Sequence, residues 1–238
     1  MPRLCFVIIV SLPIVIFYLL KVEYIEKHPQ NYTEADRYCV AQKAISIMQH
    51  NGLIHTNVYG LENLPESGGY VMYPNHQGKY DALGIISVHK EPCTVVIDKK
   101  RSYLPITDQF VTLLQGSRLD KTDMKSQLQT IISVSNEVKT GRRYIIFPEG
   151  GYDHNRNHVE DFLPGSFKCA MKAKSPIVPV ALIDSYKPFE LNSLKPVTTQ
   201  VHFLEPIYYE EYKDMTSREI SELTKSRIVS RIQKVCEA

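Results

Sequence analysis

Residues 68–88 read GGYVMYPNHQGKYDALGIISV, and this stretch decides the fold. Its first part, up to Pro74, is a short apolar run typical of a buried strand, and Tyr80 to Val88 suit a helix. Further strands are expected at 94–98, 117–119, 144–147, 177–183 and 199–204, and further helices at 106–114, 122–139, 167–173 and 217–236. This alternation indicates an α/β fold with a mainly parallel sheet flanked by helices.

The helix expected over 122–139 carries apolar residues that fall on one face. They are Met124, Leu128, Ile131, Ile132 and Val138.

The N-terminal run over 4–20, LCFVIIVSLPIVIFYLL, is uncharged and lies between Arg3 and Lys21. It is near the lower limit of the roughly 17 to 25 residues that cross a bilayer, and Pro13 is placed to kink it. A cleaved secretory signal has a similar composition, but no small-x-small cleavage site follows Leu20. We therefore expect a retained membrane helix, either spanning or half-inserted. The near-symmetric flanking charges give no orientation.

A second helix is expected after this anchor, because Thr33 and Asp36 have capping-box spacing. Its apolar residues at helical intervals are Val40, Ala44, Ile47 and Met48. This amphipathic helix either packs on the domain or lies on the membrane surface. We expect residues 1–50 to form the anchor region and residues 51–238 to form one catalytic domain with no internal repeat.

The composition excludes several classes of protein. A net charge of +2 with 23% charged residues gives no basic excess, so nucleic acid is not an expected partner. The five cysteines are scattered, without Cys-x-x-Cys spacing, and are expected to be reduced packing residues. His154 and His158 lie on an apparently irregular loop with no fixed acidic third ligand, so no metal is expected.

His76 follows the first strand of the opening stretch, and Asp81 comes five positions later. Positions i and i+5 of a helix diverge by roughly 140°, so the two side chains meet only if His76 lies before the helix begins. A carboxylate on one ring nitrogen leaves the other nitrogen to take a proton from a hydroxyl group. The pair therefore predicts a general base, although this spacing also occurs without catalytic meaning.

Three further segments contain candidate binding residues. Arg118 in GSRLD suits a phosphate group, or an ordinary ion pair with Asp120 or Asp123. The glycines of FPEGG, over 147–151, permit close backbone approach to a ligand or simply make a turn. The trio Lys99-Lys100-Arg101 is either a solvated loop or an anion site.

The segments NHQGKYD, GSRLD, FPEG and IVPV occur in this order, and together they resemble the glycerolipid acyltransferase family over about residues 60–207. More narrowly, the chain looks like the bacterial 1-acylglycerol-3-phosphate acyltransferases. The resemblance implies that His76 is the base and that Asp81 orients it. It implies an acceptor phosphate site of Lys99 or Lys100, Arg118, Glu149 and Gly150, and a site wall or acyl-donor region of Asn75, Gly151, Val178 and Pro179. It also implies that Leu204-Glu205-Pro206-Ile207 is the family's late strand-end element.

The same resemblance implies a reaction at a membrane. A fatty acyl group would pass from acyl-CoA or acyl-carrier protein to the free hydroxyl of 1-acylglycerol-3-phosphate and give phosphatidic acid, without a cofactor. No covalent acyl-enzyme is needed, which agrees with the absence of a Gly-x-Ser-x-Gly motif. These donors imply that the catalytic domain lies on the cytoplasmic side of a bacterial plasma membrane.

One departure from the family keeps the acceptor open. Gly151 and Tyr152 stand where the family usually has threonine or serine and then arginine, and Arg156 or Lys168 could supply the missing charge. Another lysophospholipid, glycerol-3-phosphate or an amine-bearing lipid remains an alternative acceptor. A catalytically silent scaffold that binds anionic lipid, and a hydrolase that passes the acyl group to water, are the alternatives of other classes.

Overall fold

The computed structural model describes residues 2–237 and arranges seven strands in the order β1-β7-β6-β2-β5-β3-β4. The strands are β1 (Ile54–Tyr59), β2 (Val71–Pro74), β3 (Thr94–Asp98), β4 (Ser117–Leu119), β5 (Tyr144–Ile145), β6 (Ile177–Ile183) and β7 (Val197–Phe203). The helices are α1 (Pro2–Val10), α2 (Leu12–Lys27), α3 (Glu34–Gly52), α4 (Asp81–Val88), α5 (Lys99–Ser102), α6 (Thr107–Leu113), α7 (Met124–Lys139), α8 (Lys168–Ala173), α9 (Lys187–Glu190), α10 (Tyr209–Tyr212) and α11 (Ser217–Cys236). Short 3₁₀ turns lie at Pro29–Asn31, Leu61–Asn63 and Pro164–Phe167. The expected α/β class with a mainly parallel sheet is confirmed.

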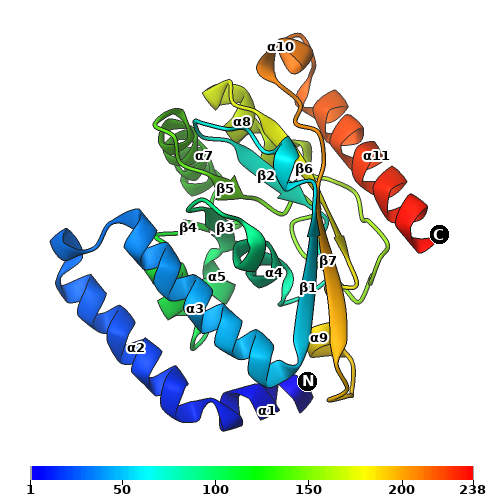
Figure 1. Ribbon diagram of the computed structural model, residues 1–238. Coiled ribbons are helices and arrows are strands. Elements are labelled where there is room, and N and C mark those ends of the chain that lie inside the picture. The colour runs from blue at the N-terminus through cyan, green and yellow to red at the C-terminus, as the bar shows by residue number, and fades with distance from the viewer. Residues whose placement is uncertain (1, 238) are drawn as a thin grey trace.

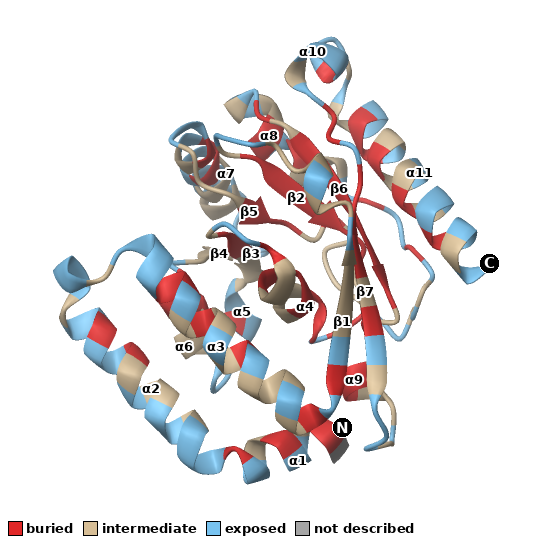
Figure 2. Cartoon of the chain, in the orientation of Figure 1, coloured by how far each residue is buried: buried red, intermediate tan, exposed pale blue. Residues whose placement is uncertain are grey.

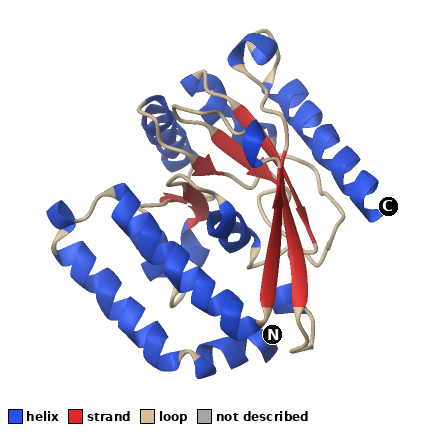
Figure 3. Cartoon of the chain, in the orientation of Figure 1, coloured by secondary structure: helices blue, strands red, loops and turns tan. Residues whose placement is uncertain are grey.

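One strand pair runs against the rest of the sheet. β6 and β7 are antiparallel, and β1 is parallel to β7, whereas β6, β2, β5, β3 and β4 are all parallel. The five parallel strands therefore end at one edge of the sheet, and β1 and β7 end at the opposite edge. Figure 3 shows β1 and β7 as a long pair at one side of the sheet. The sequence did not predict β1.

Helices cover both faces of this sheet, as Figure 1 shows. Alternate residues of β2 point to opposite sides: Val71 and Tyr73 pack with α7, α8 and α11, whereas Met72 packs with α2, α3, α4 and α6. This period of two is the side-chain geometry of a strand. Because both faces are covered, β6 is buried along its whole length.

The N-terminal run forms two helices that bend by 77° between Val10 and Leu12. Pro13 stands in the first turn of α2, where its missing N–H costs no hydrogen bond, so it starts a helix instead of kinking one. Among residues 2–237 no single helix has both the length and the apolarity of a membrane span, and only the two bent helices together meet those criteria. Val22 and Ile25 of α2 are buried in the core beside α3.

The start of α3 is as predicted, because Thr33 and Asp36 form a reciprocal capping box. Its buried face differs from the expected one. Tyr38, Ala41 and Ile45 are buried, and the four expected residues are half-buried beside them. Tyr38 donates its hydroxyl to the carbonyl oxygens of Ile86 and His89 at the end of α4. The helix therefore packs on the domain.

The expected apolar face of α7 is right only in part, because Ile131 and Val138 lie on the core as expected and the other three residues do not. Met124 is 85% exposed and Leu128 is 57% exposed, while Val134 and Val138 are buried against the core. Helical spacing places residues on a common stripe, but the position of α8 decides which stripe is covered. Figure 2 shows how exposed and buried turns alternate along the outer helices.

Candidate active site

His76 and Asp81 meet at the edge where the five parallel strands end. His76 lies in the loop after β2, and Asp81 is the first residue of α4, so the helical divergence of i and i+5 does not apply. The Nδ1 atom of His76 and the Oδ2 atom of Asp81 are 2.6 Å apart. The structure thus brings the two predicted side chains into contact.

Asp81 is held by the backbone of its own turn. The N–H groups of Gln77 and Gly78 donate to its Oδ2 atom at 2.5 and 2.8 Å, and its side chain is fully buried. Backbone donors at the start of a helix stabilise a carboxylate. With Nδ1 bound to this carboxylate, Nε2 is the ring nitrogen left to accept a proton. The His76 side chain is 16% exposed, so it can be reached from outside.

Two aromatic rings, which the sequence did not single out as catalytic-site neighbours, surround the imidazole. Phe147 stacks on His76 with ring centroids 4.1 Å apart, and Tyr152 meets it edge-on at 4.5 Å. The guanidinium of Arg101 lies over the Tyr152 ring, 5.7 Å from the ring centroid. Burial raises the pKa of Tyr152 above its usual value. Tyr152, the residue that departs from the family pattern, therefore helps to fix the base.

Glu149 contacts the backbone of His76 rather than an open phosphate site. Its Oε1 atom accepts the His76 N–H at 2.8 Å, and its Oε2 atom accepts hydrogen bonds from Asn155 Nδ2 and the Glu160 N–H. Burial raises the pKa of Glu149 to about 7, although the two backbone hydrogen bonds act in the opposite direction. Glu149 thus joins the loop over 149–160 to the turn that holds the base.

A buried hydrogen-bond network, missed by the sequence analysis, supports the same turn. Gln77 donates from Nε2 to Asn157 Oδ1 and to the carbonyl oxygen of Leu182, and its Oε1 atom accepts the Ser185 N–H at 2.7 Å. Asn157 in turn donates to Asp184 Oδ1 at 3.1 Å. Amide side chains next to a predicted base were the only sequence signal for this network.

Asn75 does not line the site. Its amide group is buried and pairs with Leu182 of β6 in both directions, accepting the Leu182 N–H at 2.7 Å and donating to the Leu182 carbonyl oxygen at 3.1 Å. It fixes the end of β2 to β6. Val178 and Pro179 are buried inside β6, where they pair with Met72 and Tyr73 before the strands end. The structure does not bring these three residues to an open wall beside His76.

The predicted cations are distributed differently from the expectation. Arg118 donates to Asp108 Oδ1 at 2.6 Å and lies over the Tyr103 ring, so its ion pair is with α6 and not with Asp120 or Asp123. Lys99 pairs with Asp120 at 3.2 Å. Lys100 is exposed on α5.

Lys121 is the cation that reaches the glycine-rich segment, and the sequence analysis missed it. Its Nζ atom donates to the carbonyl oxygen of Gly150 at 2.5 Å and lies 3.5 Å from Asp98. Gly150 has a φ of +72°, and a Cβ there would come within 2.8 Å of Leu163, so the position requires glycine. Gly151 follows it, half-buried. Arg156 lies over the Tyr186 ring and Lys168 is exposed, so neither is placed against His76.

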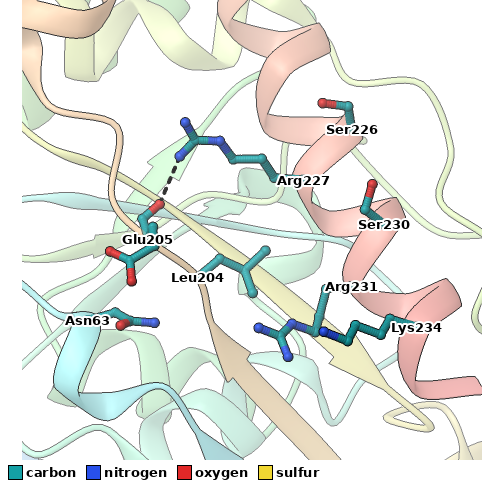
Figure 4. Close-up of a pocket in the computed structure, with 8 residues that line it drawn as sticks. All are labelled: Asn63, Leu204, Glu205, Ser226, Arg227, Ser230, Arg231 and Lys234. Carbon is teal, nitrogen blue, oxygen red and sulfur yellow. Dashed lines mark hydrogen bonds between the residues drawn. The ribbon is translucent and has the colours of Figure 1, made fainter. Parts of the chain in front are cut away.

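The late element Leu204-Glu205-Pro206-Ile207 directly follows the end of β7, and it lies at the sheet edge opposite His76. Ile207 bridges to Ile177, the first residue of β6, whereas His76 lies near the last residues of that strand. Leu204 and Glu205 line a separate cavity of about 560 Å³ with Arg227, Arg231 and Lys234 of α11 (Figure 4). This cavity is not part of the His76 site.

The histidines of the loop over 154–158 do not form a metal centre. His154 lies 3.5 Å from Glu190 and is largely exposed. Across residues 2–237, no three histidine, cysteine, aspartate or glutamate side chains are grouped so that they could hold a metal ion.

Comparisons with known proteins show which sequences and which fold resemble this chain. The acyltransferase family model matches residues 55–183. The chain is 28% identical over 155 residues to the 1-acyl-sn-glycerol-3-phosphate acyltransferase of Salmonella typhimurium, covering 65% of this chain and 63% of that protein. The Saccharomyces cerevisiae protein of the same name is 30% identical over 131 residues, covering 54% of this chain and 43% of its own length. The aligned region thus spans about half to two thirds of these relatives.

A solved structure has a similar fold. The 1-acyl-sn-glycerophosphate (LPA) acyltransferase PlsC from Thermotoga maritima matches with a TM-score of 0.73, covering 94% of this chain and 96% of that chain. The two sequences are 16% identical, so this likeness concerns the fold.

Proposed function

The chain belongs to the acyltransferase family, and from this premise we propose that it acylates 1-acylglycerol-3-phosphate to give phosphatidic acid. The observation that carries the proposal is the 2.6 Å contact between His76 Nδ1 and the buried carboxylate of Asp81. A histidine oriented in this way suits proton removal from an alcohol. The acceptor is taken from the names of the relatives.

In the proposed reaction, Nε2 of His76 accepts the proton of the free glycerol hydroxyl. The oxygen then attacks the thioester carbonyl of acyl-CoA or acyl-carrier protein, and an ester C–O bond forms. The C–S bond breaks, and the departing thiolate takes the proton from His76. The Asp81 side chain, in contact with Nδ1, stabilises the imidazolium that exists between the two proton transfers. The two residues that this reaction requires, His76 and Asp81, are in contact with each other.

Phosphate binding is proposed for Lys121 and Arg101, two cations that contact residues of the segment over 147–152. Lys121 lies on the carbonyl oxygen of Gly150, and Arg101 lies over the ring of Tyr152, which touches His76. Arg118 is a weaker candidate than the sequence implied, because its guanidinium is already paired with Asp108. Since Tyr152 takes the place of the arginine that is usual in the family pattern, another acyl acceptor is the second candidate function.

Membrane association is proposed through the outer side of α1 and α2. Ile9 is 71% exposed, and Phe17 and Leu20 are each 60% exposed. The 77° bend and the buried end of α2 support insertion of this apolar side into one leaflet rather than a straight span. We propose that the catalytic domain faces the compartment that holds the thioester donors, which is the bacterial cytoplasm.

An acceptor panel tests the function. Purified protein should transfer a radiolabelled acyl group from acyl-CoA or acyl-carrier protein to 1-acylglycerol-3-phosphate, and His76→Ala should lower the rate by about 10²-fold or more because the base is lost. Vesicle binding should be unchanged in that variant.

Three outcomes of this panel contradict the proposal. Equal rates with phosphate-free acceptors would favour the second candidate, and release of free fatty acid without an acylated product would indicate a hydrolase. Full activity in His76→Ala would remove the assigned base, and a silent scaffold would transfer nothing to any acceptor.

A further inference from the structure

Arg3 is fully buried, although it opens the apolar helix α1. Its guanidinium donates from Nη1 to the carbonyl oxygens of Lys187 and Pro188 at 3.3 and 3.2 Å, and from Nη2 to the carbonyl oxygen of Lys195. A buried charge is costly unless hydrogen bonds compensate for its lost hydration. The three carbonyl oxygens therefore form a specific binding site for this guanidinium group.

These carbonyl groups belong to α9 and to the loop that leads into β7. α9 follows β6 at the same edge of the sheet as His76, and Figure 1 shows α1 near it. Leu4 of α1 also packs on the cluster of Tyr80 and Phe189, whose rings are 5.9 Å apart. Tyr80 directly precedes Asp81. α1 thus contacts both α9 and the beginning of α4.

The segment before α9 is hydrogen-bonded to the turn that carries the base. Ser185 donates its N–H to Gln77 Oε1 at 2.7 Å, and Gln77 donates its own N–H to the Asp81 carboxylate at 2.5 Å. The side chain of Asp184 accepts a hydrogen bond from Asn157, which also contacts Gln77. A continuous set of buried contacts therefore joins Arg3 to Asp81.

The opposite side of α1 faces outward. Phe6 and Ile9 are exposed, whereas Arg3 and Val7 are buried against the domain. We infer that Arg3 is a positioning residue that fixes the lipid-facing helix to α9, and so sets the orientation of His76 relative to the membrane from which the acceptor enters. This inference rests on the proposed function and names the residue that aligns the site with its lipid substrate.

Loss of this contact should not unfold the protein or detach it from lipid. Val7 still packs on α3, Ser11 still accepts a hydrogen bond from Asn51 at 2.6 Å, and α2 is still held by Val22 and Ile25. Just before α9, Ser185 also keeps its hydrogen bond to Gln77, and Asp184 keeps its hydrogen bond from Asn157. Only the first turn of α1 should come loose from α9. The chemistry at His76 should then survive for an acceptor that needs no alignment with a membrane.

The test compares two acceptors in the full chain. Arg3→Met keeps a long apolar side chain but removes every donor, and Arg3→Lys restores a cation with fewer and differently directed donors. With long-chain 1-acylglycerol-3-phosphate in phosphatidylcholine vesicles, we expect Arg3→Met to lower kcat by about tenfold at unchanged KM, while turnover of a short-chain acceptor in free solution stays within about twofold of wild type. Arg3→Lys should recover part of the lost kcat.

Arg218→Met is the matched control, because Arg218 is an exposed arginine of α11 that pairs only with Glu222. It should match wild type on both acceptors. Hydrogen exchange supplies a readout that does not depend on activity: amides over 187–196 should exchange faster in Arg3→Met and not in Arg218→Met.

An equal loss on both acceptors would show that Arg3 supports the fold alone, and weaker vesicle binding would show that it supports the anchor alone. Either result would overturn the inference, as would unchanged exchange over 187–196. A wild-type protein that turns over neither acceptor would instead overturn the proposed function.

Discussion

Glu149 shows what burial does to a single residue at this site. Its carboxylate accepts the backbone N–H of His76 from a position where burial raises its pKa to about 7. The resemblance to the acyltransferase family implied that Glu149 belongs to the site, but not that it contacts the backbone of the base. The partners of Arg118 and Lys121 were equally hidden in the sequence, because both residues are cations of one short segment. Only the folded chain shows that Arg118 pairs with Asp108 and that Lys121 reaches Gly150.

The shift at Glu149 predicts a pH dependence of stability. Because its folded pKa lies above the ordinary value of 4.5, the folded protein holds this proton more tightly than the unfolded chain does. The resulting stabilisation is present at low pH and is lost as the pH rises through about 7. In urea unfolding, the free energy of wild type should fall by roughly 1–3 kcal/mol more than that of Glu149→Gln between about pH 5 and pH 8.

Glu66→Gln is the control for this measurement, since Glu66 is exposed. It should follow the wild-type curve. Parallel curves for wild type and Glu149→Gln would show that Glu149 titrates normally in the folded protein.

Among the elements, α1 and α2 show best that an apolar run in the sequence does not reveal how its residues pack. The sequence predicts one membrane helix here. The structure has two helices, with one side packed on the domain and the other side exposed. α7 is a second example of this dependence on packing. Its apolar stripe was expected to be one face, yet Met124 and Leu128 point outward because α8 contacts the neighbouring stripe. In both cases local periodicity was correct and the packing partner decided which side is covered.

The exposed side of α1 and α2 predicts where lipid binds. Ile9→Lys and Phe17→Lys should each weaken binding to phosphatidylcholine vesicles by at least about tenfold, because each replaces an inserted apolar side chain with a charge. Neutral vesicles are required, since anionic lipid would attract the new lysine. Cosedimentation measures the effect.

Leu128→Lys is the matched control on α7, where an apolar side chain is equally exposed but lies outside the proposed membrane face. It should bind vesicles as wild type does. Equal weakening by all three substitutions would assign membrane binding to general surface apolarity.

The whole molecule is organised by the reversed pair β1 and β7. Because β7 is antiparallel to β6, it ends at the sheet edge opposite His76. Leu204 and Glu205, which follow β7, therefore line the cavity beside α11. This reversal could not be predicted from the sequence, since a strand has the same alternation of side chains in either direction. The order of strands and helices along the chain was otherwise close to the prediction, apart from the unpredicted β1 and the unpredicted short helices α5, α9 and α10.

This topology predicts that Glu205→Ala leaves catalysis nearly intact. Its kcat/KM for 1-acylglycerol-3-phosphate should stay within about twofold of wild type, because ligands of such sheets bind at the edge where the parallel strands end. Asp81→Ala at that edge should lose about 10²-fold or more, because the base loses its orienting partner. A large loss in Glu205→Ala would mean that the substrate reaches both edges.

The sequence by itself determined the local features: the α/β rhythm, the capping box of α3, and the placement of His76 in a loop just before a helix that begins at Asp81. These depend on periodicity and on hydrogen bonds between residues a few positions apart. The tertiary structure alone decided that Arg3 is buried against the carbonyl oxygen of Lys187, 184 positions away, that Lys121 and not Arg118 lies beside Gly150, and that the end of β7 faces away from the base. Such contacts depend on how distant segments pack, and one chain's residue pattern carries no record of its distant partners.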